Sequence, residues 1–122
     1  MALFYRSYFA MIRNPLINST GLNTSGLRGV IQQILKILEE DKPEYLAVAS
    51  DSSEPTFRHQ RFPAYKATRE KMPEDLVEQL PYLPRLVEAL HLPYLIIPGY
   101  EADDIIGTLM HWCFKADLEG VM

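Results

Sequence analysis

The chain has 122 residues, of which 48% are hydrophobic and 23% are charged, a balance typical of one soluble domain or of part of one. It contains no run of the roughly 18 to 20 apolar residues that a membrane span needs, and we see no secretory signal. Its single cysteine, Cys113, excludes an internal disulfide and lacks the partners that a zinc site would need. The net charge of −4 by itself disfavours a nucleic-acid binder, and we expect a cytoplasmic protein without a membrane partner.

The first part of the chain is expected to be helical. Residues 3–12 are apolar and aromatic and predict a short helix, whereas residues 14–23 are rich in Asn and predict a loop. Thr24 or Ser25 is expected to cap a second helix, because apolar residues recur at helical spacing from Leu27 to Leu38. The charged run that follows predicts the end of this helix.

The middle of the chain predicts a strand, a long irregular segment and a broken helix. Tyr45 to Ala49 is a short apolar run of the kind found in buried parallel strands. Residues 50–71 are polar and basic without a clear period, and they indicate a long functional loop or an irregular arch. Pro73 suits the first position of a helix, and Pro81 and Pro84 predict that this helix is kinked or divided into two shorter ones.

The last part predicts a second strand and a third long helix. Residues 93–97 are strand-sized, Pro98 and Gly99 mark a turn, and residues 102–116 have helical periodicity. Strands that alternate with helices predict an α/β fold with parallel strands. Two strands make a poor sheet, and the chain opens and closes on helices, so we expect that a strand is missing at each end.

Acidic residues follow both predicted strands. Asp51 comes directly after the first strand, and Glu101, Asp103 and Asp104 come after the second, at the start of a helix. Because the carboxyl ends of parallel strands meet at one edge of a sheet, we expect these carboxylates to converge. Four such charges repel strongly, so we expect the cluster to be stable only if it is protonated or holds cations such as Mg²⁺ or Mn²⁺. The alternative is that these residues only cap helices and turns.

The irregular segment carries five of the 12 Lys and Arg residues, interleaved with aromatic residues. The basic residues are Arg58, Arg61, Lys66, Arg69 and Lys71, and the aromatic residues are Phe57, Phe62 and Tyr65. Basic side chains neutralise phosphates and aromatic rings stack on unpaired bases, which favours nucleic-acid binding. The alternative is a solvated loop with a few anchoring rings, in which His59 is another polar loop residue.

Several of these runs are similar to a known family. Residues 51–59, 65–73 and 98–107 resemble the 5′→3′ exonuclease domain of bacterial DNA polymerase I, of the flap endonuclease or PIN-like 5′-nuclease family. Residues 3–10 and 18–26 also match, so the similarity runs in order over essentially the whole chain. The Phe-Arg-His…Tyr-Lys and Tyr-Glu-Ala-Asp-Asp blocks are its most specific parts.

The resemblance implies a PIN-like, or resolvase-like, three-layer α/β fold with a parallel sheet, incomplete here, and a basic helical arch over about residues 57–80. It also implies structure-specific cleavage of DNA at 5′ ends and flaps by two divalent ions, Mg²⁺ or Mn²⁺. The implied metal ligands are Asp51, Glu101, Asp103 and Asp104. The implied catalytic residues near the scissile phosphate are Lys66 and Arg69. The expected DNA-binding residues are Arg6, Arg58, Arg61, Tyr65 and Lys71.

The chain also departs from the family pattern. Family members carry an Asp on a strand before the first helix and an Asp-Lys-Asp-like block soon after the position of Met122, and this sequence has neither. We therefore expect residues 1–122 to be a partial 5′-nuclease domain, either a fragment, an incomplete reading frame or a decayed copy. The sequence leaves open a non-catalytic DNA-binding remnant, a PIN-like ribonuclease and an attached C-terminal polymerase region.

Overall fold

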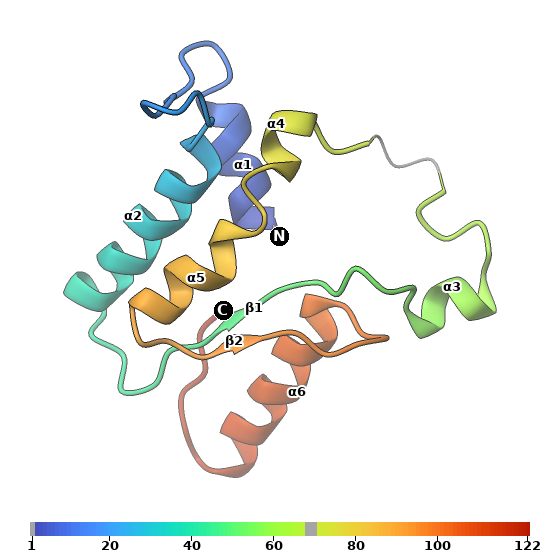
Figure 1. Cartoon of the computed structure of the whole chain (residues 1–122). Coiled ribbons are helices and arrows are strands. Elements are labelled where there is room, and N and C mark those ends of the chain that lie inside the picture. The colour runs from blue at the N-terminus through green and yellow to red at the C-terminus, as the bar shows by residue number, and fades with distance from the viewer. Residues whose placement is uncertain (1, 68–70) are drawn as a thin grey trace. The chain divides into compact units, whose positions relative to one another are not determined.

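The structure is a computed structural model that describes residues 2–67 and 71–122. In chain order its elements are α1 (Ala2–Ala10), α2 (Ser25–Glu40), β1 (Val48–Ala49), α3 (Phe57–Arg61), α4 (Glu74–Val77), α5 (Tyr82–Ala89), β2 (Tyr94–Leu95) and α6 (Ala102–Lys115) (Figure 1). None of the described helices is long and apolar enough to cross a membrane.

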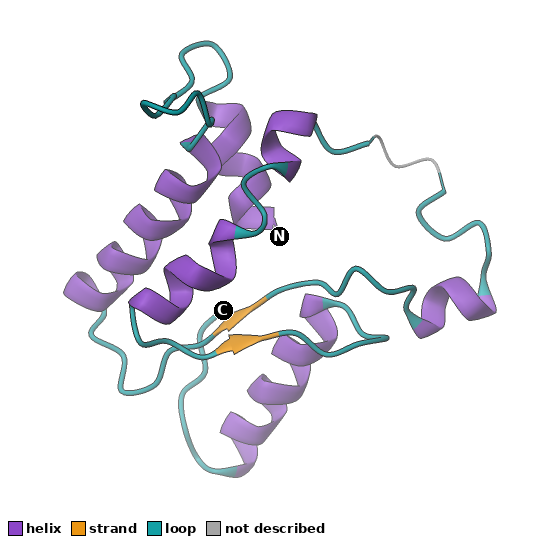
Figure 2. Cartoon of the chain, in the orientation of Figure 1, coloured by secondary structure: helices purple, strands orange, loops and turns teal. Residues whose placement is uncertain are grey.

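The chain divides into two compact units. The first consists of residues 1–46 and 70–93 and is helical, and the second consists of residues 47–69 and 94–122 and holds the strands (Figure 2). Helices combined with a small parallel sheet confirm the predicted α/β class. The three-layer arrangement stays a prediction.

In the first unit, α1 packs against α2 at unusually close range. The buried side chains of α2 include Leu27, Val30 and Ile34, which recur at the spacing of one helix face. A Cβ added at Gly26 would lie 2.8 Å from the Cε2 atom of Phe4. A Cβ added at Gly29 would overlap the side chain of Ser7. Glycine at these two positions therefore allows the helices to approach.

A polar side chain from a distant segment caps α2. Thr24 occupies the N-cap position, as predicted, but its side chain makes no capping hydrogen bond and instead donates to the Leu16 carbonyl at 3.1 Å. The Oε1 atom of the fully buried Gln79 accepts from the Gly26 and Leu27 amides at 3.1 and 3.3 Å. The capping bonds expected from Thr24 or Ser25 are thus made by Gln79, which the sequence pattern could not identify.

Asp75 joins α4 to two other segments of this unit. Its carboxylate accepts from the Tyr8 hydroxyl at 2.6 Å and from the Asn23 side-chain amide at 2.8 Å. The hydrogen bond to Asp75 raises the pKa of Tyr8 to about 12, and burial adds to this effect. The same bond is the largest cause that lowers the pKa of Asp75 below its usual value of 3.8.

The three prolines of the broken helix lie at positions that tolerate them. Pro73 is the N-cap of α4 and Pro81 is the N-cap of α5. Pro84 is the third residue of α5, where a backbone N–H would have no intrahelical partner. The prediction of two shorter helices is therefore confirmed. Pro73 was predicted to be the first helical residue, but it is the N-cap and the helix begins at Glu74.

In the second unit, β1 and β2 pair in parallel, as predicted, with Val48 opposite Tyr94 and Ala49 opposite Leu95. Both strands are shorter than the apolar runs that predicted them. The Ser50 amide donates to the Leu95 carbonyl at 3.0 Å and continues the ladder past β1. The helix α6 packs against β1 and buries Ala102 and Ile105, which confirms the predicted helix at residues 102–116.

The expectation that residues 50–71 lack regular structure is wrong for residues 57–61, which form α3. Thr56 is the N-cap of this helix, and the Nδ1 atom of His59, three residues later, accepts from the Thr56 amide at 3.2 Å. In return, the Thr56 side chain accepts from the His59 amide. These two bonds form a capping box, which stabilises a helix that is too short to show a hydrophobic period.

We expect Gly29→Ala to destabilise the protein by about 1 to 3 kcal/mol, because the added methyl group has no room against Ser7. Urea unfolding followed by circular dichroism measures this change. The matched control is Gly107→Ala in α6, where nothing lies within 4 Å of the added Cβ. This control should gain about 0.5 to 1 kcal/mol from the helix propensity of alanine, and equal effects of the two variants would contradict the close approach.

We expect Asp75→Asn to lower the free energy of unfolding at pH 7 by about 1 to 3 kcal/mol, because a charged acceptor of two hydrogen bonds is lost. The folded state lowers the pKa of Asp75, so its contribution is fully present above the unfolded pKa of about 3.8 and is lost as the pH falls through the folded pKa. The difference in the free energy of unfolding between the variant and the wild type should therefore be constant at neutral pH and narrow as the pH falls below about 3.8. The exposed Glu44→Gln is the control, and a gap that stays constant down to the lowest pH would disprove the linkage.

Candidate active site

A turn after β2 sets the position of the acidic residues. The Tyr100 amide donates to the Ile97 carbonyl at 3.2 Å, and Gly99 has a φ of 82°, a left-handed conformation that glycine adopts without strain. This is the turn that Pro98 and Gly99 predicted. The Gly99 carbonyl also accepts from the Phe57 amide at 3.2 Å, which joins the start of α3 to the turn.

The structure brings Asp51 to the start of α6. Asp51 lies two residues beyond the end of β1, and its Oδ1 atom accepts from the Ala102 amide at 2.8 Å. The first backbone amides of a helix lack intrahelical partners and carry partial positive charge, so a carboxylate is a favourable acceptor there. Residues that follow the two strands therefore meet at one place.

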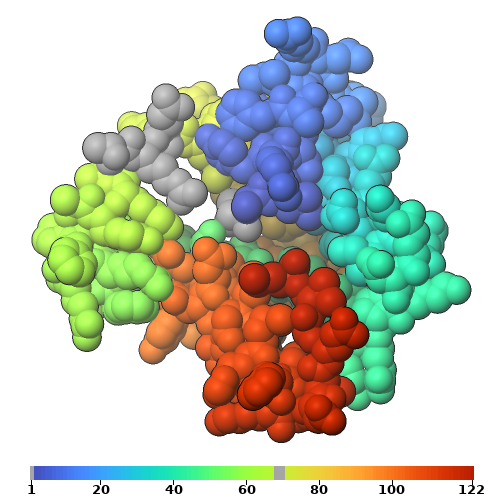
Figure 3. Space-filling view, turned by 180° about the vertical axis from the view of Figure 1, so that it is seen from behind, coloured from blue at the N-terminus to red at the C-terminus, as the bar shows by residue number. Residues whose placement is uncertain are grey.

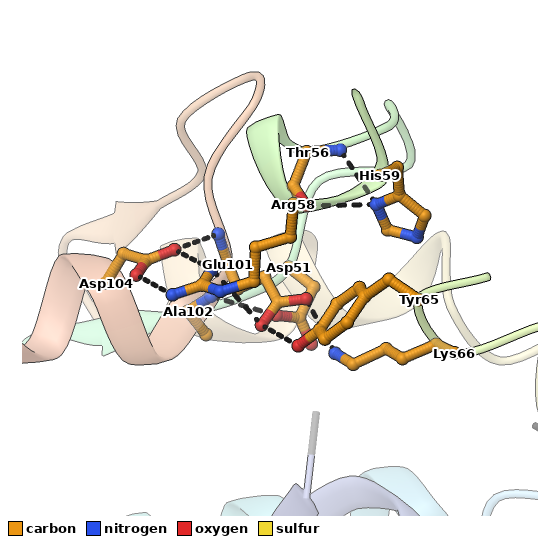
Figure 4. A network of polar contacts seen from close by, with 9 residues as sticks. All are labelled: Asp51, Thr56, Arg58, His59, Tyr65, Lys66, Glu101, Ala102 and Asp104. Carbon is orange, nitrogen blue, oxygen red and sulfur yellow. Dashed lines mark hydrogen bonds and ion pairs between the residues drawn. The ribbon is translucent and has the colours of Figure 1, made fainter. Parts of the chain in front are cut away.

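The carboxylate of Glu101 is nearly buried and is surrounded by donors (Figure 4). Lys66 donates from Nζ to Oε1 at 2.6 Å, and the Tyr65 hydroxyl donates to Oε2 at 3.3 Å. The Nη1 atom of Arg58 lies 3.5 Å from Oε2. Burial makes an unpaired carboxylate costly, and these contacts offset that cost.

Arg58 also holds Asp104 in a bidentate pair. Its two guanidinium nitrogens each donate to one Asp104 oxygen at 2.7 Å, which fixes α3 against α6. The Glu101 amide donates to the same carboxylate at 3.0 Å. The guanidinium holds the pKa of Asp104 at about 2, and the same pair raises the pKa of Arg58 above its usual value.

This network shows how two of the acidic side chains are neutralised. The sequence predicted that the acidic cluster would be stable only if it is protonated or holds cations such as Mg²⁺ or Mn²⁺. In the structure, Lys66 and Arg58 supply positive charge to Glu101, and Arg58 supplies it to Asp104. The sequence pattern assigned both basic residues to DNA and missed their contacts with the carboxylates, because those contacts join positions 35 or more residues apart.

An open pocket of about 370 Å³ lies beside this network. Its lining residues are Asp51, Ser52, Ser53, Glu54, Pro55, Thr56, His59, Lys66 and Glu101. The carboxylates of Asp51 and Glu101 are hard oxygen donors, and Mg²⁺ commonly binds one or two carboxylates and keeps several waters. These two residues therefore fit part of a Mg²⁺ site. Within residues 2–67 and 71–122, however, no group of three or more His, Cys, Asp or Glu side chains is arranged to hold a metal ion.

The remaining predicted site residues are not gathered at this pocket. Asp103 is exposed and lines, with Asp104, Tyr100 and Trp112, an apolar groove beside α6. The segment of α6, orange to red in Figure 3, lies at the face of the molecule shown there. Arg61 is exposed at the end of α3. Arg6 and Lys71 are exposed residues of the first unit, and Arg69 lies outside the described residues.

His59 is a site residue that the sequence pattern missed. It lines the pocket, and its ring meets the Tyr65 ring edge-on with centroids 5.3 Å apart. Its Nδ1 atom lies 2.9 Å from the Thr56 hydroxyl oxygen. The prediction of a polar loop residue is wrong, because His59 belongs to α3. The Thr-x-x-His spacing, equivalent to a capping box, is the signal that could have located it.

The site thus consists of acidic residues that follow two parallel strands of an α/β fold, with basic residues bound to them. Over residues 1–122 the chain matches the family described as "5'-3' exonuclease, N-terminal resolvase-like domain". The chain belongs to this family, whose members are nucleases.

Named relatives agree with this family. The chain is 43% identical over 111 residues to DNA polymerase I of Synechocystis sp., and 43% identical over 107 residues to DNA polymerase I of Treponema pallidum. Each match covers 88% of this chain and 11% of the relative. The match to DNA polymerase I of Geobacillus stearothermophilus has 40% identity over 117 residues, with 95% of this chain and 13% of the relative covered. The chain thus spans about one eighth of the length of these relatives.

We expect Asp51→Ala to destabilise the protein by about 0.5 to 2 kcal/mol, because the Ala102 amide loses its acceptor at the start of α6. Asp51→Asn keeps an oxygen acceptor of the same shape, and its stability should stay within about 0.5 kcal/mol of the wild type. Thermal unfolding of both variants measures the difference. If Asp51→Ala and Asp51→Asn lower the stability by the same amount, the hydrogen bond to the Ala102 amide does not stabilise the helix.

Proposed function

We propose that this chain provides part of the active site of a structure-specific 5′→3′ exonuclease, or flap endonuclease, that hydrolyses DNA phosphodiester bonds. The observation that carries the proposal is the meeting of Asp51, Glu101 and Lys66 at one pocket. Two carboxylates and an ammonium group match the needs of a divalent cation and a phosphate. Membership of the exonuclease family supports the same reaction.

The carboxylates are proposed to hold divalent ions, Mg²⁺ or Mn²⁺. Asp51 and Glu101 line the pocket, and Asp103 and Asp104 are assigned as further ligands by the family resemblance alone. When bound, two such ions supply Lewis acidity to the attacking water and to the leaving oxygen. Carboxylates held by the backbone amide of α6 and by Arg58 are already oriented, which lowers the cost of assembling the site.

The basic residues are proposed to bind the DNA backbone. Lys66 and Arg69 are assigned to the scissile phosphate, and residues 57–80 to a helical arch. The assigned backbone contacts are Arg6, Arg58, Arg61, Tyr65 and Lys71. The complete protein is proposed to have the three-layer PIN-like fold and a C-terminal polymerase region, because the matched relatives are DNA polymerases of much greater length. Residues 1–122 are then a partial 5′-nuclease domain.

A second candidate is a DNA-binding chain of the same fold without catalytic activity. The observation that favours it is that Lys66 and Arg58 already neutralise Glu101, while no cluster of three or more ligands is found in the part of the chain that the structure describes. Such a chain would retain its affinity for phosphates and would lack hydrolysis.

In the longer protein that we propose contains this chain, we expect Glu101→Gln to slow the Mg²⁺- or Mn²⁺-dependent cleavage of a 5′-flap DNA by about 100-fold, since the variant loses one carboxylate charge at the pocket. Glu88→Gln, an exposed substitution on α5, is the matched control and should cleave normally. Products are measured on a denaturing gel.

Other outcomes separate the alternatives. Salt-sensitive DNA binding that is lost in Lys66→Ala, without any cleavage by the wild type, would support the non-catalytic chain. Cleavage of RNA in preference to DNA would support a ribonuclease. Absence of both cleavage and binding would reject the nuclease proposal.

A further inference from the structure

We propose that Lys66 is an exchangeable counter-ion that competes with divalent cations for the carboxylate of Glu101. The inference rests on the proposed function, because it concerns the same pocket. It adds that the Lys66 ammonium group occupies the Glu101 carboxylate in the absence of metal and leaves it when a metal ion binds.

The charges around Glu101 make such a competition necessary. The side chain of Glu101 is only 11% exposed, and the Nζ atom of Lys66 is 2.6 Å from its Oε1 atom. A divalent cation bound to the same carboxylate would lie within a few ångströms of the ammonium group, where like charges repel strongly at the low dielectric of a half-buried site. The carboxylate therefore favours one of the two cations at a time.

The two basic partners of Glu101 are not equally able to leave. Arg58 is fixed by two hydrogen bonds of 2.7 Å to Asp104, and its distance to Glu101 is longer, at 3.5 Å. Lys66 is a point charge on a flexible stem, and its side chain is 34% exposed. Of the two basic partners of Glu101, Lys66 is thus the one that exchanges with a metal ion at this carboxylate.

The position of Lys66 suits an exchange of this kind. Lys66 has a φ of 58°, a left-handed conformation that residues with a side chain rarely adopt. Its Nζ atom also lies 5.2 Å from the centroid of the Tyr65 ring. A metal ion at Glu101 would repel the ammonium group from the carboxylate, and the lysine would then be available to a phosphate.

Binding of Mn²⁺ in the absence of DNA tests the competition. The loss of electron paramagnetic resonance signal from free Mn²⁺ gives the affinity of the purified chain. We expect Lys66→Met to bind Mn²⁺ about tenfold more tightly than the wild type, because a competing charge is removed from a partly exposed site. Lys66→Arg, which keeps the charge, should bind with an affinity close to that of the wild type.

Two controls make the result specific. Lys36→Met removes the same charge from an exposed pair with Glu40, 3.7 Å long, and should leave Mn²⁺ affinity unchanged. In a Glu101→Gln background, Lys66→Met should also have no effect. Unchanged or weaker Mn²⁺ binding by Lys66→Met, or no Mn²⁺ binding by any variant, would overturn the inference. These measurements contain no DNA, so a chain that fails to cleave DNA yet shows the affinity shift rejects only the nuclease proposal.

Discussion

The buried carboxylate of Glu101 is the constraint on which the second unit depends. Burial requires partners for this charge, and the partners come from separate segments: Lys66 and Tyr65 after α3, and Arg58 within it. Arg58 also binds Asp104, so one guanidinium ties α3 to two acidic residues of the α6 terminus. The ion pairs and hydrogen bonds of Glu101 thus hold α3 and the residues after it in place, although no residue of α3 is buried.

In the helical unit, uncharged and charged side chains likewise provide hydrogen-bond partners for buried polar groups. Gln79 satisfies the first amides of α2, and Asp75 accepts from Tyr8 and Asn23. Among the described residues, no buried side-chain nitrogen or oxygen lacks a hydrogen-bond partner. The apolar contacts between α1 and α2 provide the driving force, and these polar contacts select one arrangement of the helices around them.

The same ion pairs that stabilise the pocket also limit its chemistry. Carboxylates neutralised by lysine and arginine need no metal ion for stability. On our proposal, a divalent cation binds Glu101 by exchange with Lys66 and not by simple addition. A site of this kind is preorganised, since its acidic residues are already oriented by Arg58 and by the Ala102 amide. The relatives are about eight times as long as this chain, which matches only 11–13% of their length.

The sequence by itself determined the helices with clear hydrophobic periods, the parallel strands and the turn at Pro98 and Gly99, because these depend on local patterns. It also determined the family, because the family motifs occur in order along the chain. Only the tertiary structure decided that Gln79 caps α2 and that Lys66 and Arg58 neutralise the acidic residues, since these bonds join positions distant in the chain. The helix α3 was missed because its five residues are too few for a hydrophobic period. Local patterns predict local structure, whereas the pairing of charges depends on which segments the fold brings together.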